Sequence, residues 1–111
     1  MDTLESYRQI IRRILAEYAR IAYPRGEIER QTVFDSQQDH YLLVKAGWDG
    51  DQHVYGCLIH VDIKDEKIWI QYDGIEYGMA NELVDAGVPK DRIVLAFKPP
   101  YVRPFTEFAP A

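Results

Sequence analysis

The sequence has little cysteine, little serine and no long apolar run, and each shortage excludes a class of protein. Cys57 is the single cysteine of 111 residues, so the chain has no partner for an internal disulfide and no cysteine pair for zinc. Ser6 and Ser36 lie in no nucleophile-elbow pattern, which argues against a serine hydrolase. No segment approaches the ~18 apolar residues that a membrane helix needs, and the first residues lack a signal-peptide pattern. We therefore expect a cytoplasmic protein in a reducing compartment.

Basic residues are also fewer than acidic ones. The chain has 13 Lys and Arg residues against 18 Asp and Glu residues, for a formal net charge of −5 at pH 7. Because affinity for a phosphate backbone comes from cations that displace counterions, this balance argues against a free-standing DNA-binding module. Hydrophobic residues make up 47% of the chain and aromatic residues 13%. That is enough to build one core, and we expect a single domain over residues 1–111.

The hydrophobic periodicity predicts two helices and five strands. Apolar residues recur at spacings of three and four over residues 3–22, which is typical of an amphipathic helix, with Asp2 in a capping-box position. A second helix is predicted over residues 75–86, where Gly87 supplies a left-handed C-cap. Short polar turns between successive strands require antiparallel neighbours. The predicted fold class is α+β with the order α-β-β-β-β-α-β, an antiparallel β-meander packed against the N-terminal helix. The strands are expected at residues 27–34, 40–48, 53–63, 68–72 and 93–97, before an irregular, proline-rich tail at residues 98–111.

Period-two alternation divides the predicted sheet into two faces. One face is apolar and should receive the first helix; it includes Leu42, Val44, Ala46, Trp48, Tyr55, Cys57, Ile59, Val61 and Ile63. Cys57 is accordingly predicted to be a small core residue. The other face is mixed, because polar groups stand beside large aromatic side chains there. It is predicted to hold Tyr41, Leu43, Val54, Leu58, His60, Asp62, Trp69 and Gln71, with His60 opposite Gln71, Asp62 opposite Trp69 and, on the apolar face, Ile59 opposite Tyr72.

Two interpretations of the mixed face stay open. Either the second helix or the tail covers it, with its polar groups bonded to one another, or it binds a second copy of the chain or a different protein. Apolar anchors among polar groups are typical of protein interfaces, which favours binding as the functional interpretation. The candidate partner-binding residues, on this face and in the tail, are Tyr41, Leu58, His60, Asp62, Trp69, Gln71, Lys98, Tyr101 and Arg103.

The histidines and carboxylates form no recognisable catalytic or metal-binding pattern. His40 and His53 fall near strand ends and His60 on the mixed face, and neither His-x₃-His nor Cys-x₂-Cys spacing occurs. Residues 65–67 (Asp-Glu-Lys) match half of a metal-dependent nuclease signature, but the candidate acid partner Asp49 lies about 35 Å away along the third strand. We interpret that triplet as a turn. The prediction is therefore no enzyme, no metal and no cofactor.

Several stretches spread over nearly the whole chain resemble one family. In order, they include Tyr7-Arg8-Gln9-Ile10-Ile11, Gly47-Trp48-Asp49-Gly50-Asp51, His60-Val61-Asp62-Ile63-Lys64-Asp65, Lys67-Ile68-Trp69-Ile70-Gln71 and Phe97-Lys98-Pro99-Pro100. On these motifs the chain resembles the XisI family, the controlling factor for excision of the fdxN element. Where relatives often read Phe-His-Pro-Pro-Glu, this chain has Lys98 and Tyr101, so this loop differs in charge.

The resemblance implies an XisI-like fold and a non-enzymatic accessory factor for site-specific excision of a DNA element. Such a factor would act by contacts with a companion XisH-type protein, with a recombinase, or with both, and an acidic chain suits a basic partner. Two alternatives stay open: an antitoxin- or immunity-like inhibitor of a nuclease-fold partner, and a DNA-binding directionality factor that places the arginines of the first helix on phosphates. Self-association also stays open. The resemblance implies no catalytic residues, and the lack of a long apolar run predicts no membrane contact.

Overall fold

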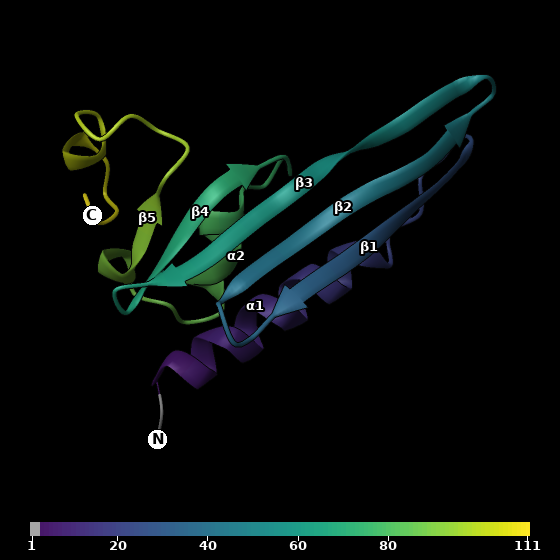
Figure 1. The fold of residues 1–111 in the computed structure, drawn as a ribbon. Helices are drawn as coiled ribbons and strands as arrows, with labels where there is room; N and C mark the ends of the chain where they lie inside the picture. The colour runs from purple at the N-terminus through teal and green to yellow at the C-terminus, as the bar shows by residue number, and fades with distance from the viewer. Residues whose placement is uncertain (1–2) are drawn as a thin grey trace.

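The computed structural model describes residues 3–111 as two α-helices, five strands and two short 3₁₀ turns (Figure 1). The predicted order α-β-β-β-β-α-β and the α+β class are confirmed. Asp2, which we expected to cap the first helix, lies outside the described residues. The elements are α1 (Thr3–Ala19), β1 (Glu27–Asp35), β2 (His40–Asp49), β3 (Gln52–Lys64), β4 (Lys67–Asp73), α2 (Met79–Asp85), η1 (Lys90–Arg92), β5 (Ile93–Leu95) and η2 (Arg103–Phe105).

The five strands form one sheet in the order β1-β2-β3-β4-β5. β1 to β4 are antiparallel neighbours and form the predicted meander, whereas β5 runs parallel to β4. A parallel pair needs a crossover connection, and α2 lies in this one. Between β3 and β4, Asp65 and Glu66 both have positive φ (53° and 63°), as a type I′ hairpin turn requires. Asp65 and Glu66 therefore form a turn, as predicted, and Lys67 begins β4.

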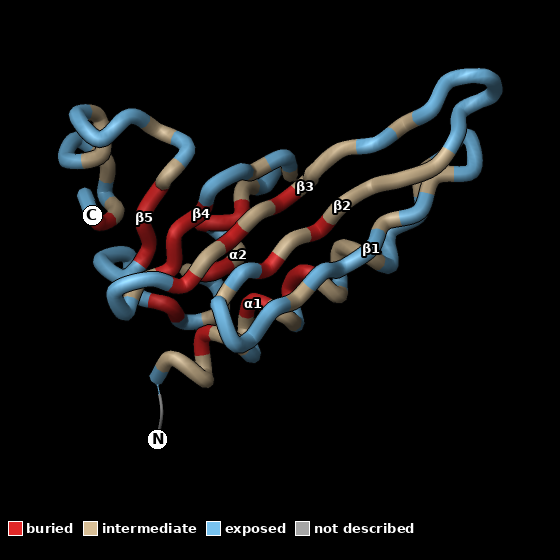
Figure 2. Tube along the Cα trace, viewed as in Figure 1, coloured by how far each residue is buried: buried red, intermediate tan, exposed pale blue. Residues whose placement is uncertain are grey.

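Both helices lie on the same face of the sheet, and the main core fills the space beneath them (Figure 1). Buried residues gather where β2 to β5 pass the helices, while the far end of the β2–β3 hairpin shows only intermediate and exposed residues (Figure 2). We call the sheet face away from the helices the open face. The largest fully buried side chains are Tyr41, Ile11, Leu15, Leu43, Ile59, Ile68, Ile70, Met79, Leu83, Ile93, Val61 and Val94.

A β-bulge between β2 and β3 overturns part of the predicted face assignment. Leu43 pairs with Ile59 and Val44 pairs with Cys57, so Leu58 is an extra residue with no partner in β2. An extra residue moves the side chains on one side of it to the opposite face. The bulge places Leu43 in the core at 0% exposure, and leaves Val44 and Cys57 on the open face.

The prediction was therefore wrong for residues on both faces. Tyr41 and Leu43, which we assigned to the mixed face, are fully buried against the helices. Six residues that we assigned to the helix-covered face lie outside the core: Leu42, Val44, Ala46, Trp48, Tyr55 and Cys57. The physical reason is that strict alternation holds only while the ladder is unbroken.

A second bulge lies between β3 and β4. The predicted pairs Ile63–Ile68, Val61–Ile70 and Asp62–Trp69 are confirmed. Beyond them the register shifts, and Gln71 becomes the extra residue. His60 consequently lies opposite Tyr72 instead of Gln71, and Ile59 lies opposite Asp73 instead of Tyr72.

α2 begins four residues later than predicted, because Gly78 has φ 95°, which no helical residue adopts. The carboxylate of Asp73 accepts a hydrogen bond from the backbone N–H of Met79 (2.8 Å) at the start of the helix. At the other end, Gly87 has φ 101° and donates to Val84 O, while Val88 donates to Leu83 O. This is a Schellman motif, and it confirms the predicted glycine C-cap.

The tail is irregular, as predicted, but it is tied to the sheet. Ala109 donates to Ile93 O (2.8 Å) and forms a bridge with Val94. The Arg103 guanidinium donates to Lys98 O and to Ala96 O, which holds the loop closed. The tail packs Ala109 against Trp69 and so covers one end of the open face.

Candidate functional site

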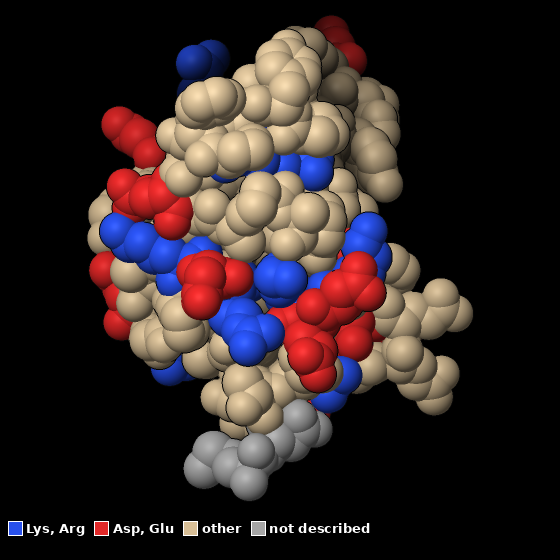
Figure 3. All heavy atoms as spheres, turned by 90° about the vertical axis from the view of Figure 1, so that its left-hand side faces the viewer, with Lys and Arg blue, Asp and Glu red and all other residues tan. Residues whose placement is uncertain are grey.

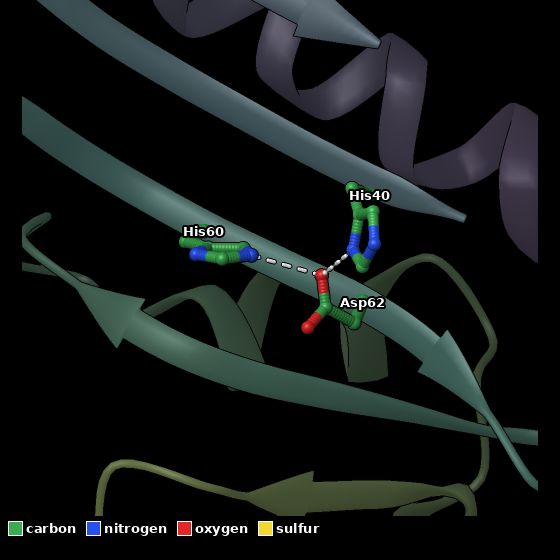
Figure 4. Close-up of side chains that lie close together, drawn as sticks. All are labelled: His40, His60 and Asp62. Carbon is green, nitrogen blue, oxygen red and sulfur yellow. Dashed lines mark hydrogen bonds and ion pairs between the residues drawn. The ribbon is translucent and has the colours of Figure 1, made fainter. Parts of the chain in front are cut away.

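Three side chains that can carry protons or bind a metal lie together on the open face, at the start of β2 and near the end of β3. His40 at the start of β2 pairs directly with Asp62 of β3, and His60 lies two residues from Asp62 on the same face. Asp62 Oδ1 lies 2.7 Å from His40 Nδ1 and 2.9 Å from His60 Nε2 (Figure 4). An ionised carboxylate accepts hydrogen bonds only, so both ring nitrogens donate to the same oxygen. We call these three residues the histidine–aspartate cluster.

The side chains of the cluster are partly exposed to solvent, and Asp62 influences the pKa of His40. The exposed fractions of the side chains are 49% for His40, 33% for His60 and 17% for Asp62. The hydrogen bond to Asp62 raises the pKa of His40, and the nearby negative charge acts in the same direction. Two imidazoles and one carboxylate can hold protons or coordinate a divalent transition-metal ion.

The bulge at Leu58 is what creates this cluster. Counted back from the Asp49–Gln52 pair, an unbroken ladder would put His40 opposite Val61. The extra residue shifts the ladder by one and puts His40 opposite Asp62. Of the three residues, His60 and Asp62 were among the predicted partner-binding residues, and His40 was not. No local sequence signal marks the bulge, so His40 could not have been found from its spacing.

Trp69 does not stand free on the open face. It is 9% exposed and packs against Val94 and Ala109. Its indole Nε1 donates to Lys64 O (2.9 Å), the Lys64 ammonium lies 4.2 Å from the ring centroid, and the Arg103 guanidinium lies 5.7 Å from it. These contacts make Trp69 an attachment point for the tail. For this residue, the interpretation that the tail covers the face is the one the structure supports.

Exposed aromatic side chains stand on the segment that runs from the end of β5 into the tail, and we call them the tail patch: Phe97, Tyr101 and Phe105. Their exposed fractions are 45%, 77% and 89%. Figure 3 views the molecule from the tail's side and shows mostly residues other than Lys, Arg, Asp and Glu above a band of mixed charges. Lys98 is half-buried, with its ammonium 5.7 Å from the Phe97 ring.

The predicted site residues thus fall into separate groups. His60 and Asp62 belong to the cluster, whereas Lys98, Tyr101 and Arg103 belong to the tail. Tyr41 is a core residue, and Leu58 is half-buried and packs against the core. Gln71 is exposed at the second bulge. The predicted fifth strand included Phe97, but β5 ends at Leu95 and Phe97 is exposed, so that part of the prediction was wrong. Phe105 was not selected, although its place among the prolines of the tail could have marked it as exposed.

The arginines of α1 are engaged with carboxylates. Arg8 makes a two-pronged ion pair with Asp39 (2.7 and 3.1 Å), and this bond holds the pKa of the Asp39 carboxyl below its usual value. Arg12 contacts Glu5 and the Ser36 hydroxyl. Pairing of this kind cancels much of the positive potential that a phosphate track needs.

Comparison with known proteins identifies the family. The family model described as XisI protein matches residues 1–110. The chain belongs to the XisI family. This agrees with the motifs on which the resemblance was based, and it supports the excision-control terms that go with the family name.

Two solved XisI structures from Anabaena variabilis ATCC 29413 are similar over nearly their whole length. An XisI-like protein is 37% identical with a TM-score of 0.90, and the match covers 97% of this chain and 99% of that one. The fdxN element excision controlling factor XisI is 34% identical with a TM-score of 0.83, covering 99% and 100%. Among curated proteins, none matches this chain. Within residues 3–111, no helix has the length and apolar character to cross a membrane.

Proposed function

We propose that this XisI-family chain is a non-enzymatic controlling factor for DNA-element excision that acts by binding a companion XisH-type protein through the tail patch. The observation that carries the proposal is the exposure of Phe97, Tyr101 and Phe105 on one segment. Exposure of large aromatic side chains to water is energetically unfavourable. Aromatic residues are also enriched among the strongest contributors to protein interfaces. The name of the similar Anabaena protein, an excision controlling factor, supports a regulatory role.

The way the tail is held supports the same proposal. Arg103 binds two backbone carbonyls of the tail, Ala109 is bonded to β5, and Lys90 forms an ion pair with Glu107. These contacts tie down the backbone on both sides of the exposed aromatic residues. A surface that is ordered before binding loses less entropy on association, so more of its contact energy appears as affinity.

Charge favours a protein over DNA as the direct partner. The net charge of −5 repels a phosphate backbone and attracts a basic protein surface. The pairing of Arg8 and Arg12 with carboxylates counts against a DNA-binding role for α1. A DNA-handling companion with a basic surface fits this balance.

The test is co-expression with the XisH-type companion, followed by measurement of the complex mass by light scattering and of its affinity. We expect a stable complex that Tyr101→Ala and Phe105→Ala each weaken about tenfold or more, because each removes an exposed aromatic anchor. Tyr55→Ala is the matched control. Tyr55 is 72% exposed, close to the 77% of Tyr101, but it lies on the β2–β3 hairpin.

The outcomes separate clearly. Weakening by the tail variants alone supports the proposal. Equal affinity for wild type and both tail variants, with folding shown by circular dichroism, contradicts docking at the tail patch. Weakening by Tyr55→Ala alone moves the interface to the hairpin. Failure to form any complex, combined with salt-dependent DNA binding, favours the directionality-factor alternative.

A further inference from the structure

We propose that the histidine–aspartate cluster binds one divalent transition-metal ion of the Zn²⁺ type, with His40 Nδ1, His60 Nε2 and an Asp62 carboxylate oxygen as ligands. These three ligand atoms lie within 4.8 Å of one another (Figure 4). Neighbouring ligands of tetrahedral Zn²⁺ lie roughly 3.3 Å apart, given metal–ligand distances of about 2.0 Å. The two N···O distances, 2.7 and 2.9 Å, are slightly shorter than that. To admit an ion, the side chains must rotate so that all three ligand-to-ligand distances approach this value.

The backbone holds the three ligands in place. His40 and Asp62 are directly paired across β2 and β3, and His60 follows at the next position on the same face. Beside them, Ile63 donates to Asp39 O (3.0 Å), which fixes the start of β2 against β3. A site built on adjacent strands keeps its geometry better than one built on loops.

The ligand chemistry favours a transition metal. Imidazole nitrogens are ligands for Zn²⁺, Ni²⁺, Co²⁺ and Cu²⁺, whereas Ca²⁺ and Mg²⁺ prefer oxygen. Asp62 supplies one negative charge, and neutral imidazoles coordinate once the two bridging protons move to the other ring nitrogens or to solvent. Three protein ligands leave a fourth position for water or for a donor from a partner molecule.

This inference is independent of the tail patch. The cluster lies on β2 and β3, and none of its contacts within residues 3–111 reaches Phe97, Tyr101 or Phe105. A metal site can therefore be present whether or not the tail binds a companion. The alternative within the cluster is a purely hydrogen-bonded trio, in which Asp62 joins the two strands and binds no ion. The experiment distinguishes these two states.

The first test is calorimetric titration of the untagged full chain with ZnCl₂. We expect one Zn²⁺ per chain, and at least a tenfold loss of affinity in His40→Ala, His60→Ala and Asp62→Asn. The chain provides its own matched control, because His53 is its third histidine and lies on the hairpin, in a tilted contact with Trp48 with ring centroids 4.8 Å apart. His53→Ala should bind Zn²⁺ as the wild type does.

The second test does not depend on variants that fold. Nitrogen-15 NMR of wild-type imidazole rings, recorded before and after one equivalent of ZnCl₂, should show large shifts for His40 and His60 and none for His53. The inference is overturned if the wild type takes up no Zn²⁺, if the shifts appear at His53 instead, or if His53→Ala loses affinity as much as the cluster variants do.

Discussion

The two halves of the β2–β3 pair both carry apolar side chains, but one half is covered by the helices and the other is not. Toward the helices, β2 and β3 bury Tyr41, Leu43, Ile59 and Val61 completely. Toward the hairpin, none of residues 44–58, all of which the structure describes, is buried (Figure 2). The hairpin nevertheless carries apolar and aromatic residues such as Val44, Trp48 and Tyr55. The difference arises because α1 and α2 cover only one half of the sheet, so the half that is covered supplies the stability.

The uncovered half is held mainly by its ladder and by ring contacts. β1 and β2 stay paired from Glu27–Trp48 to Asp35–His40. The Trp48 ring makes a tilted contact with His53, whose ring is stacked with that of Tyr55 at a centroid distance of 6.5 Å. Cross-strand aromatic contacts of this kind contribute roughly 0.2–1 kcal/mol each, far less than a buried side chain. The hairpin should therefore open locally before the covered half unfolds.

The largest expected effect tests the two faces of one strand. Leu43→Ala removes a side chain with 0% exposure from beneath the helices, and should lower the free energy of unfolding by about 2–5 kcal/mol. Leu42→Ala changes the neighbouring half-buried residue on the open face and should cost about 1 kcal/mol or less. Urea denaturation of both variants measures the difference. Equal losses would contradict the bulge at Leu58, on which the assignment of both faces depends.

A smaller effect is expected where β1 meets β2 in the uncovered half. Gly47 has φ 156°, and a Cβ there would lie 2.0 Å from Glu27 O. Gly47→Ala must push β1 away and should cost about 1–3 kcal/mol through strain. Hydrogen exchange should accelerate in β1 and the hairpin while β4 and β5 keep their protection. Gly50→Ala is the control for glycine loss, because no atom lies within 4 Å of its added Cβ. Uniform acceleration across the sheet would show that the two halves unfold together.

The smallest effect concerns the covered half and depends on pH. Burial and a hydrogen bond to Glu82 raise the pKa of Tyr18 from 10.0 to about 12. Between those values the folded state holds the proton more tightly than the unfolded state, so this stabilisation is lost as pH rises through about 10 to 12. Tyr18→Phe should be less stable than wild type at pH 8, by under about 1 kcal/mol because the pair is partly solvated.

The pH dependence itself is the measurement for Tyr18. Urea denaturation from pH 8 to pH 12 should show the gap between wild type and Tyr18→Phe closing as pH rises. Tyr55→Phe, on the exposed hairpin, should track the wild type throughout. If the difference in free energy of unfolding between wild type and Tyr18→Phe does not change with pH, the Tyr18–Glu82 bond between α1 and α2 contributes nothing to stability.

Much of the fold could be predicted because its signals are local. The spacing of apolar residues marked α1, the short polar turns marked the meander, and Gly87 marked the end of α2. The register at the β3–β4 turn also followed from the sequence, since a two-residue turn pairs Ile63 with Ile68 directly. The late start of α2 could not be predicted, because Gly78 breaks the helix in a stretch that retains a helical apolar pattern.

The candidate site could be predicted only in part, because it depends on contacts between distant residues. His60 and Asp62 alternate on one strand and were selected together, whereas His40 joins them only through the bulge at Leu58. Trp69 was expected as an exposed anchor, but the tail returns across the sheet and covers it. The covering segment lies some forty residues along the chain from Trp69, so no local pattern reports it.

The sequence by itself determined the family, the order of the elements and the acidic charge, because motifs, hydrophobic period and composition are properties of short stretches. The tertiary structure alone decided which strand face is covered, which side chains meet at Asp62 and which aromatic residues remain exposed. The reason is geometric. One extra residue in a ladder reverses the face of its neighbours, and packing against a distant segment determines whether they meet water.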